Sequence, residues 1–149
     1  MITASAHAEP TSGSVDELAD ELMRTSVNLP EPLAELNRVF DQYEDALVHN
    51  RVDVLDTLFW NSLHTLRYGA GENLVGYEQI KAFRAARPNA GLSRTILGRH
   101  IVTFGDSMGV ANVTFKRPNE SRVGRQSQTW VKFAHGWRVV SAHVSWMDA

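Results

Sequence analysis

The 149-residue chain contains no cysteine, which excludes disulfides, thiolate metal sites and a cysteine nucleophile. It also has no long apolar run and no charged-then-apolar leader, so we expect a soluble, cytoplasmic protein without a membrane partner. An excess of charge of one sign is missing too, because the formal net charge is only −2. Its basic residues are scattered and are not interleaved with aromatic ones, so we expect no nucleic-acid partner.

Several catalytic and binding motifs are absent. The six histidines form no pair at metal-ligand spacing, so we expect neither a metal nor another cofactor. No Gly-x-Ser-x-Gly nucleophile motif occurs. Gly71 and Gly76 have the separation found in a phosphate-binding loop, but Tyr77-Glu78 stands where Lys and Ser or Thr are required.

What the chain does have is enough apolar residues, 43%, for one domain with a core. Residues 1–28 begin with a small, polar, aperiodic stretch and are predicted to be a disordered or loosely helical extension, with one short helix over 15–23. Residues 29–149 are predicted to form a single domain.

Helical periodicity follows two prolines. Apolar residues recur every three or four positions after Pro32, which is tolerated in a first helical turn. This stripe predicts a helix of about five turns. Its members are Leu33, Leu36, Phe40, Tyr43 and Leu47. Two shorter helices are predicted over 52–59 and 77–86, with a small hairpin between them over 65–68 and 73–75.

The rest of the chain is β-patterned. Four consecutive antiparallel strands are predicted over 92–104, 108–116, 123–133 and 137–146. Helices followed by a meander indicate an α+β fold, in which three N-terminal helices cover one face of a curved sheet. Strict alternation along the last strand would place Trp137 and Val139 on the opposite face from Val140, Ala142 and Val144. That outer face then needs a cover, and a homodimer is the simplest one.

The order of these elements resembles the cone-shaped fold of the nuclear-transport-factor-like superfamily, which includes ketosteroid isomerases and SnoaL-like cyclases. Within it, five strings resemble the AtzH and HpxZ family, whose small proteins are encoded beside amidases of cyanuric acid and oxalurate breakdown. The strings are FDQYEDAL, VLDTLFW, TLRYGAGENLVGYEQIKAFRAARP, GRQSQTW and GWRVVSAHVSWM. The resemblance covers residues 33 to 147, in order and without a large gap.

The resemblance implies an amidohydrolase-like reaction that removes a carboxyl group from 1,3-dicarboxyurea and leaves allophanate. It also implies that Tyr43 and Arg67 are the catalytic residues. From the residues alone, a core tyrosine is the more frequent case for Tyr43, and a solvated strand edge is the more frequent case for Arg67. With the implied roles, Tyr43 would donate a proton to the departing nitrogen, and Arg67 would orient a carboxylate.

Five further residues are candidate substrate-binding groups. Arg84 and Arg87 share one side of a helix, and we favour Arg87 as a second cation that would make the site prefer a dianion. Trp60 and Trp130 would wall the site. Comparison with related cone folds places Gln126, Gln128 and Trp130 inside, where the amides could bind a urea carbonyl and N–H together.

Three other functions stay open. The protein could bind a small carboxylate or ureido acid without turnover, as an accessory protein working with an amidase. It could be only a dimerisation module. It could also be an isomerase or dehydratase, which generally needs an Asp or His base in the pocket. However, Asp41 and Asp45, which flank Tyr43, are predicted on the polar side of the helix.

Overall fold

The chain folds into four helices and one curved sheet over residues 12–148, which the computed structural model describes. The helices and strands follow one another in the order that the periodicity predicts. They are α1 (Ser12–Thr25), α2 (Pro30–Val48), α3 (Val52–Leu58), β1 (Leu66–Tyr68), β2 (Asn73–Val75), α4 (Tyr77–Ala86), β3 (Thr95–Phe104), β4 (Met108–Lys116), β5 (Val123–Phe133) and β6 (Gly136–Met147).

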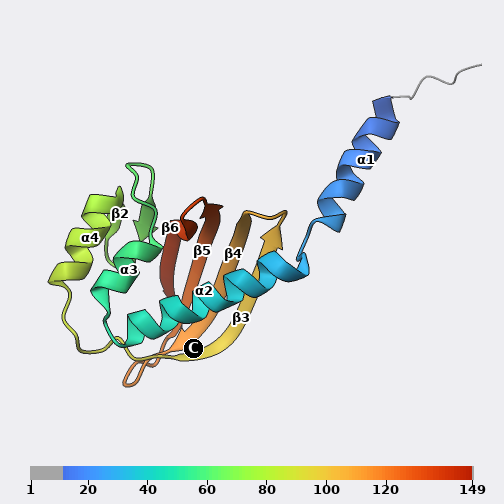
Figure 1. Ribbon diagram of the computed structural model, residues 1–149. Coiled ribbons are helices and arrows are strands. Elements are labelled where there is room, and N and C mark those ends of the chain that lie inside the picture. Colours follow the sequence, from blue (N-terminus) through green and yellow to red (C-terminus); the bar gives the residue numbers. More distant parts are fainter. Residues whose placement is uncertain (1–11, 149) are drawn as a thin grey trace, which may run out of the picture.

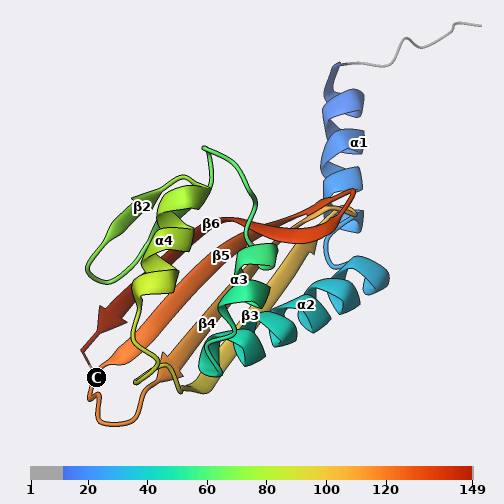
Figure 2. The same ribbon diagram turned by 60° about the vertical axis from the view of Figure 1, so that its left-hand side comes forward.

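The sheet has the strand order β2-β1-β6-β5-β4-β3. Strands β3 to β6 form the predicted antiparallel meander, and the small hairpin extends it because β1 pairs in parallel with β6. Helices α2, α3 and α4 all lie on the same, concave side (Figures 1 and 2). The predicted α+β fold, with helices on one face of a curved sheet, is confirmed as a single domain.

Helix α2 is positioned by its apolar stripe. Pro30 stands at its first position, where proline costs no hydrogen bond. Leu36 and Phe40 are fully buried and Tyr43 is 6% exposed, so this face packs on the sheet. The helix ends before Asn50, whose φ of 49° lies in the left-handed region that asparagine tolerates.

The last strand contains a β-bulge that corrects one prediction. Thr129 pairs with Ser141, but the next residue of β5, Trp130, pairs with Val139. Val140 is therefore an extra residue in β6, and the alternation of side chains changes phase there. As a result Trp137 and Val139 are buried on the inner face together with Ala142, whereas Val140 is only half-buried.

The strand predicted to begin at Leu92 begins at Thr95 instead. The segment 87–94 is a loop, and it carries Arg94 over the sheet. Helix α1 extends the short helix predicted over 15–23 and projects away from the body (Figure 1). The predicted disorder of residues 1–11 lies outside the described residues. None of the described helices is long and apolar enough to cross a membrane.

We predict that Gly124→Ala destabilises the fold. Gly124 lies opposite Phe115 in the β4–β5 pairing, and a Cβ there would overlap the buried Phe115 ring. Such overpacking costs about 1–3 kcal/mol of unfolding free energy. The matched control is Gly71→Ala, where nothing lies within 4 Å of the added Cβ. Urea unfolding of both variants measures the difference, and equal losses would contradict the prediction.

Candidate functional site

Two neighbouring cavities open between the helices and the concave face of the sheet. The inner one has a volume of about 40 Å³ and the outer one about 200 Å³. The side chains that line both are Arg67, Phe83, Arg87, Arg117 and Val144. Three guanidinium groups therefore stand where the two cavities meet.

The sheet register builds the floor of this site. Arg67 on β1 pairs with Ala142 on β6, which pairs with Gln128 on β5, which pairs with Ala111 on β4. Residues paired across a sheet point to the same face, so all four lie on the concave side. The two alanines leave room on both sides of the Gln128 side chain.

Tyr43 enters the inner cavity from α2. Its ring makes an edge-to-face contact with Trp130, with 6.2 Å between centroids, and a tilted contact with Phe59. These contacts fix the ring against a rigid aromatic base. No hydrogen bond joins its hydroxyl to another residue within the described part of the chain, and Tyr43 lines the polar inner cavity. It is therefore available to a guest molecule.

Arg67 lines both cavities from β1. One of its terminal nitrogens donates to the Glu72 carboxylate at 2.7 Å, and the guanidinium lies 5.5 Å from the centre of the Phe83 ring. Glu72 reaches back over the hairpin turn because Gly69 has no side chain, and a Cβ there would overlap the carboxylate. Arg67 has five donors, so Glu72 leaves part of the fork available.

Positive charge dominates the inner cavity. Five arginines line it, and they are Arg67, Arg84, Arg87, Arg94 and Arg117. Three of them form ion pairs at 2.7 Å, with Glu72, Asp56 and Glu44. Arg87 and Arg117 form no ion pair among residues 12–148. The site thus carries two uncompensated positive charges.

The structure separates the two candidate arginines of α4. Arg84 is buried, paired with Asp56 and stacked 4.6 Å from the centre of the Phe59 ring. Arg87 follows the helix end. Its guanidinium makes one hydrogen bond within the described residues, a long one of 3.4 Å to the Asn50 side chain. Burial lowers the pKa of Arg87, and the neighbouring Arg84 lowers it further. Both line the cavity, but only Arg87 has no carboxylate partner among the described residues.

A second unpaired cation, Arg117, follows the end of β4. It lies over the Phe115 ring at 5.7 Å and the Trp146 ring at 5.5 Å. Burial lowers its pKa, as do the charges of Arg94 and Arg67. Sequence reasoning missed it because residues 117–120 read as an ordinary turn.

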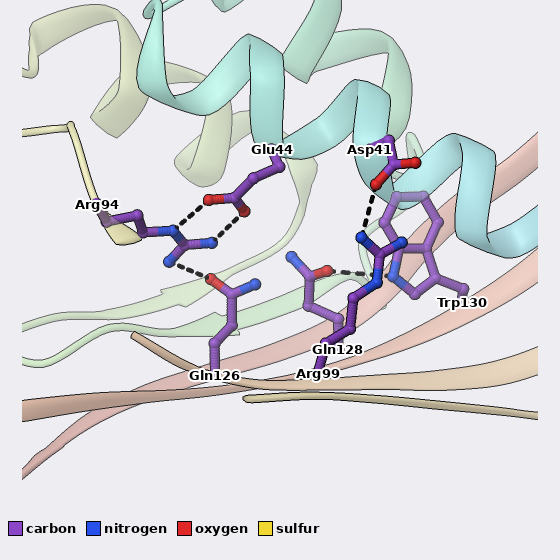
Figure 3. Close-up of polar contacts among 7 residues, drawn as sticks. All are labelled: Asp41, Glu44, Arg94, Arg99, Gln126, Gln128 and Trp130. Atoms are coloured by element: carbon purple, nitrogen blue, oxygen red, sulfur yellow. Dashed lines mark hydrogen bonds and ion pairs between the residues drawn. The ribbon is translucent and has the colours of Figure 1, made fainter. Parts of the chain in front are cut away.

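Arg94 fixes one of the two glutamines. Its side chain is 1% exposed and donates to both oxygens of Glu44 at 2.7 Å. A third guanidinium nitrogen donates to Gln126 Oε1 at 3.2 Å. Figure 3 shows this chain of contacts running from α2 through the loop before β3 to β5. Glu44 and Arg94 therefore hold the Gln126 amide in one orientation.

Each of the two glutamine amides has a partner for its oxygen. Trp130 Nε1 donates to Gln128 Oε1 at 3.1 Å, as Arg94 does to Gln126. Arginine and the indole can only donate, so these two contacts fix which end of each amide is the oxygen, and each oxygen accepts one hydrogen bond from them. The two Nε2 groups are buried without an acceptor among the described residues, and Figure 3 shows them turned toward each other. That these amides bind a carbonyl and an N–H together stays a prediction, and the Gln126 and Gln128 atoms without a partner are their Nε2 donors.

The two tryptophans lie in different places. Trp130 is fully buried beneath Tyr43 and supports both Tyr43 and Gln128. Trp60 stacks on Phe133, with 5.4 Å between ring centroids, and on His64. Trp60 lines neither cavity. The structure thus brings Tyr43, Arg67, Arg87 and Gln126 to one inner cavity, whereas Gln128, Trp130 and Trp60 line neither cavity.

The comparisons with known proteins agree with this architecture. The sequence model of the AtzH-like family matches residues 25–149. The chain is a member of the AtzH-like family. No protein of curated function matches it.

Solved structures resemble this AtzH-like chain at two levels. A Pectobacterium atrosepticum protein of unknown function, from the DUF3225 family, is 52% identical, with a TM-score of 0.82, and the match covers 83% of this chain and 97% of that one. A Burkholderia xenovorans cystatin-like fold protein is 35% identical, with a TM-score of 0.80 and the same coverage. A nuclear transport factor 2-like superfamily protein from Salmonella enterica is 23% identical over 80% of this chain and 92% of its own, with a TM-score of 0.62, which shows the fold alone.

We predict that Glu44→Gln destabilises this AtzH-like protein by about 2–4 kcal/mol, because it leaves the buried Arg94 charge without its carboxylate. Asp41→Asn is the matched control on the same helix. Asp41 also pairs with an arginine, Arg99 at 2.6 Å, but its side chain is 66% exposed (Figure 3). Its loss should cost less than about 1 kcal/mol. Unfolding free energies from urea titration compare the two, and similar values would show that burial does not decide the effect.

Proposed function

We propose that this protein removes one N-carboxyl group from a urea that carries two, of the 1,3-dicarboxyurea type, and leaves allophanate. The observation that carries the proposal is the set of groups gathered at one cavity. These are two arginines without a carboxylate, a tyrosine hydroxyl without a partner among the described residues, and the unpartnered amide N–H group of Gln126. Membership of the AtzH-like family adds to it.

The charge of the site favours a dianion. Removing a cation from water is costly unless an opposite charge compensates it. Arg87 and Arg117 have no such compensation among the described residues, so an anionic guest with two charges relieves both at once. A planar carboxylate also matches the planar fork of a guanidinium.

The amides favour a carbonyl between the two carboxylates. The unpartnered Nε2 group of Gln126, which lines the inner cavity, can donate to that carbonyl oxygen. A dicarboxylated urea offers acceptors at both ends and a carbonyl oxygen at its centre. A ligand that needs acceptors from these amides would instead leave the buried donors unsatisfied.

The chemistry requires one proton and one held carboxylate. When the C–N bond of the N-carboxyl group breaks, its electron pair stays on nitrogen, which takes the proton of the Tyr43 hydroxyl, and the carboxyl carbon leaves as carbon dioxide. Arg67 orients that carboxylate. The charges of Arg87 and Arg117 stabilise the phenolate until water returns the proton. Trp130 keeps the base of the site dry.

A binding role without turnover is the alternative, in which the protein holds a small carboxylate for an amidase. A homodimer through the outer face of the sheet fits either role, since no described helix covers that face (Figure 2). An isomerase or dehydratase is less well supported, because it needs a free carboxylate or histidine as a base. Of the carboxylates beside the inner cavity, Glu44, Asp56 and Glu72 all pair with arginines.

We predict that Arg67→Met weakens binding of glutarate, a stable dicarboxylate whose chain has the same number of atoms between its carboxylates as that of dicarboxyurea. Loss of a charged hydrogen bond of about 1.5–3 kcal/mol corresponds to roughly ten- to a hundredfold in Kd. Arg99→Met is the control, because Arg99 is also a strand arginine with a carboxylate partner and a phenylalanine beneath it, but it lines neither cavity. Titration calorimetry measures the Kd of both variants, and equal losses of affinity would show that the ligand binds elsewhere.

We predict that Tyr43→Phe lowers turnover of 1,3-dicarboxyurea by about a hundredfold or more, the usual cost of losing a proton donor. Release of ¹³C-labelled carbon dioxide and bicarbonate from the freshly prepared substrate, followed by NMR, measures the rate. The affinity for glutarate should stay within about threefold, because the ring contacts remain. Wild-type turnover in the variant would disprove the acid role. Binding by the wild type without any turnover would favour the accessory function.

A further inference from the structure

Arg117 occupies a distinctive place at the junction of the two cavities. It follows directly on β4, and its side chain lines both cavities. Arg67 and Arg87 stand at the same junction, but they belong to the wall formed by β1 and α4. Arg67 contacts Phe83 of α4, and Arg87 follows the end of that helix. Arg117 instead rests on rings from β4 and β6, so it faces the guest from a different wall.

The contacts of Arg117 hold its charge in place without neutralising it. The Phe115 and Trp146 rings lie 5.7 and 5.5 Å from the guanidinium carbon. Aromatic faces attract a cation and limit its motion, but they do not satisfy its N–H groups. Its Nε is buried without a hydrogen-bond partner. No carboxylate pairs with it in residues 12–148, whereas Arg67 already has Glu72.

Because the cations lie on two different walls, we expect them to bind different parts of the guest. A guest with a single carboxylate can be bound by the Arg67 and Arg87 wall alone. A guest with two carboxylates separated by a central carbonyl must place the second one away from that wall. The remaining cation that is oriented, half-buried and without an ion-pair partner among the described residues is Arg117.

We propose that Arg117 is the specificity-determining residue that binds the second carboxylate and so selects dicarboxylated over monocarboxylated guests. This inference rests on the proposed function and assigns a role within the same site. It makes Arg117 a discriminating group and not a contributor to affinity in general. Its loss should therefore affect one ligand of a matched pair and spare the other.

The test compares glutarate with glutaramate, its half-amide, which has the same shape and one charge fewer. Calorimetry should show that the wild type binds glutarate about tenfold or more tightly than glutaramate, a difference of about 1.4 kcal/mol. In Arg117→Met the preference should fall to within about twofold, because only the affinity for glutarate drops. Arg117→Lys keeps the charge and should retain part of the preference. Thermal melting checks that each variant is folded.

Arg122→Met is the matched control. Arg122 also lies over the Trp146 ring, at 5.2 Å, but it pairs with Glu120 and lines neither cavity. It should keep the wild-type preference. If the wild type prefers glutarate and Arg117→Met does too, or weakens both ligands equally, the role of Arg117 is wrong while the site stands. If the wild type binds neither ligand, the proposed function fails as well.

Discussion

The electrostatic balance of the buried arginines is the constraint on which this site depends. A guanidinium in a closed space needs a carboxylate, an aromatic face or a ligand to replace its water. The protein supplies a carboxylate to Arg67, Arg84 and Arg94 and leaves two cations without one. The three pairs hold the walls together, because they join β1 to the hairpin turn, α4 to α3, and the loop before β3 to α2. The two unpaired cations are what remain for recognition.

Packing and recognition are joined through shared aromatic rings. Phe115 carries Arg94 on its face at 4.4 Å and lies near Arg117, and the absence of a side chain at Gly124 makes room for this ring. Trp130 likewise supports Tyr43 and commits the oxygen of Gln128. The same buried rings therefore stabilise the domain and set the direction of the polar groups. A site built in this way has little freedom to rearrange, which suits a ligand of fixed shape.

Much of this arrangement follows from local patterns, and the rest does not. The 3.6-residue stripe placed Tyr43 on the buried face of its helix, and alternation grouped Gln126, Gln128 and Trp130 on one face. The β-bulge at Val140 has no glycine or other local signal, so strict alternation put Trp137 and Val139 on the wrong side. Arg94 and Glu44 meet across 50 positions, and only the folded chain shows that Arg94 belongs to a loop over the site.

The orientation of the glutamine amides makes the strongest distinction between functions of this fold. A cavity that mixes donors and acceptors could bind neutral or cationic molecules. Here the amide oxygens of Gln126 and Gln128 accept hydrogen bonds from Arg94 and Trp130, and the carboxylates beside the inner cavity form ion pairs with arginines. The buried atoms of the inner cavity's lining that have no partner in residues 12–148 are N–H groups of Arg87, Arg117 and Gln126. Such a cavity disfavours a cation, and it favours a ligand whose oxygen atoms can accept hydrogen bonds from these donors.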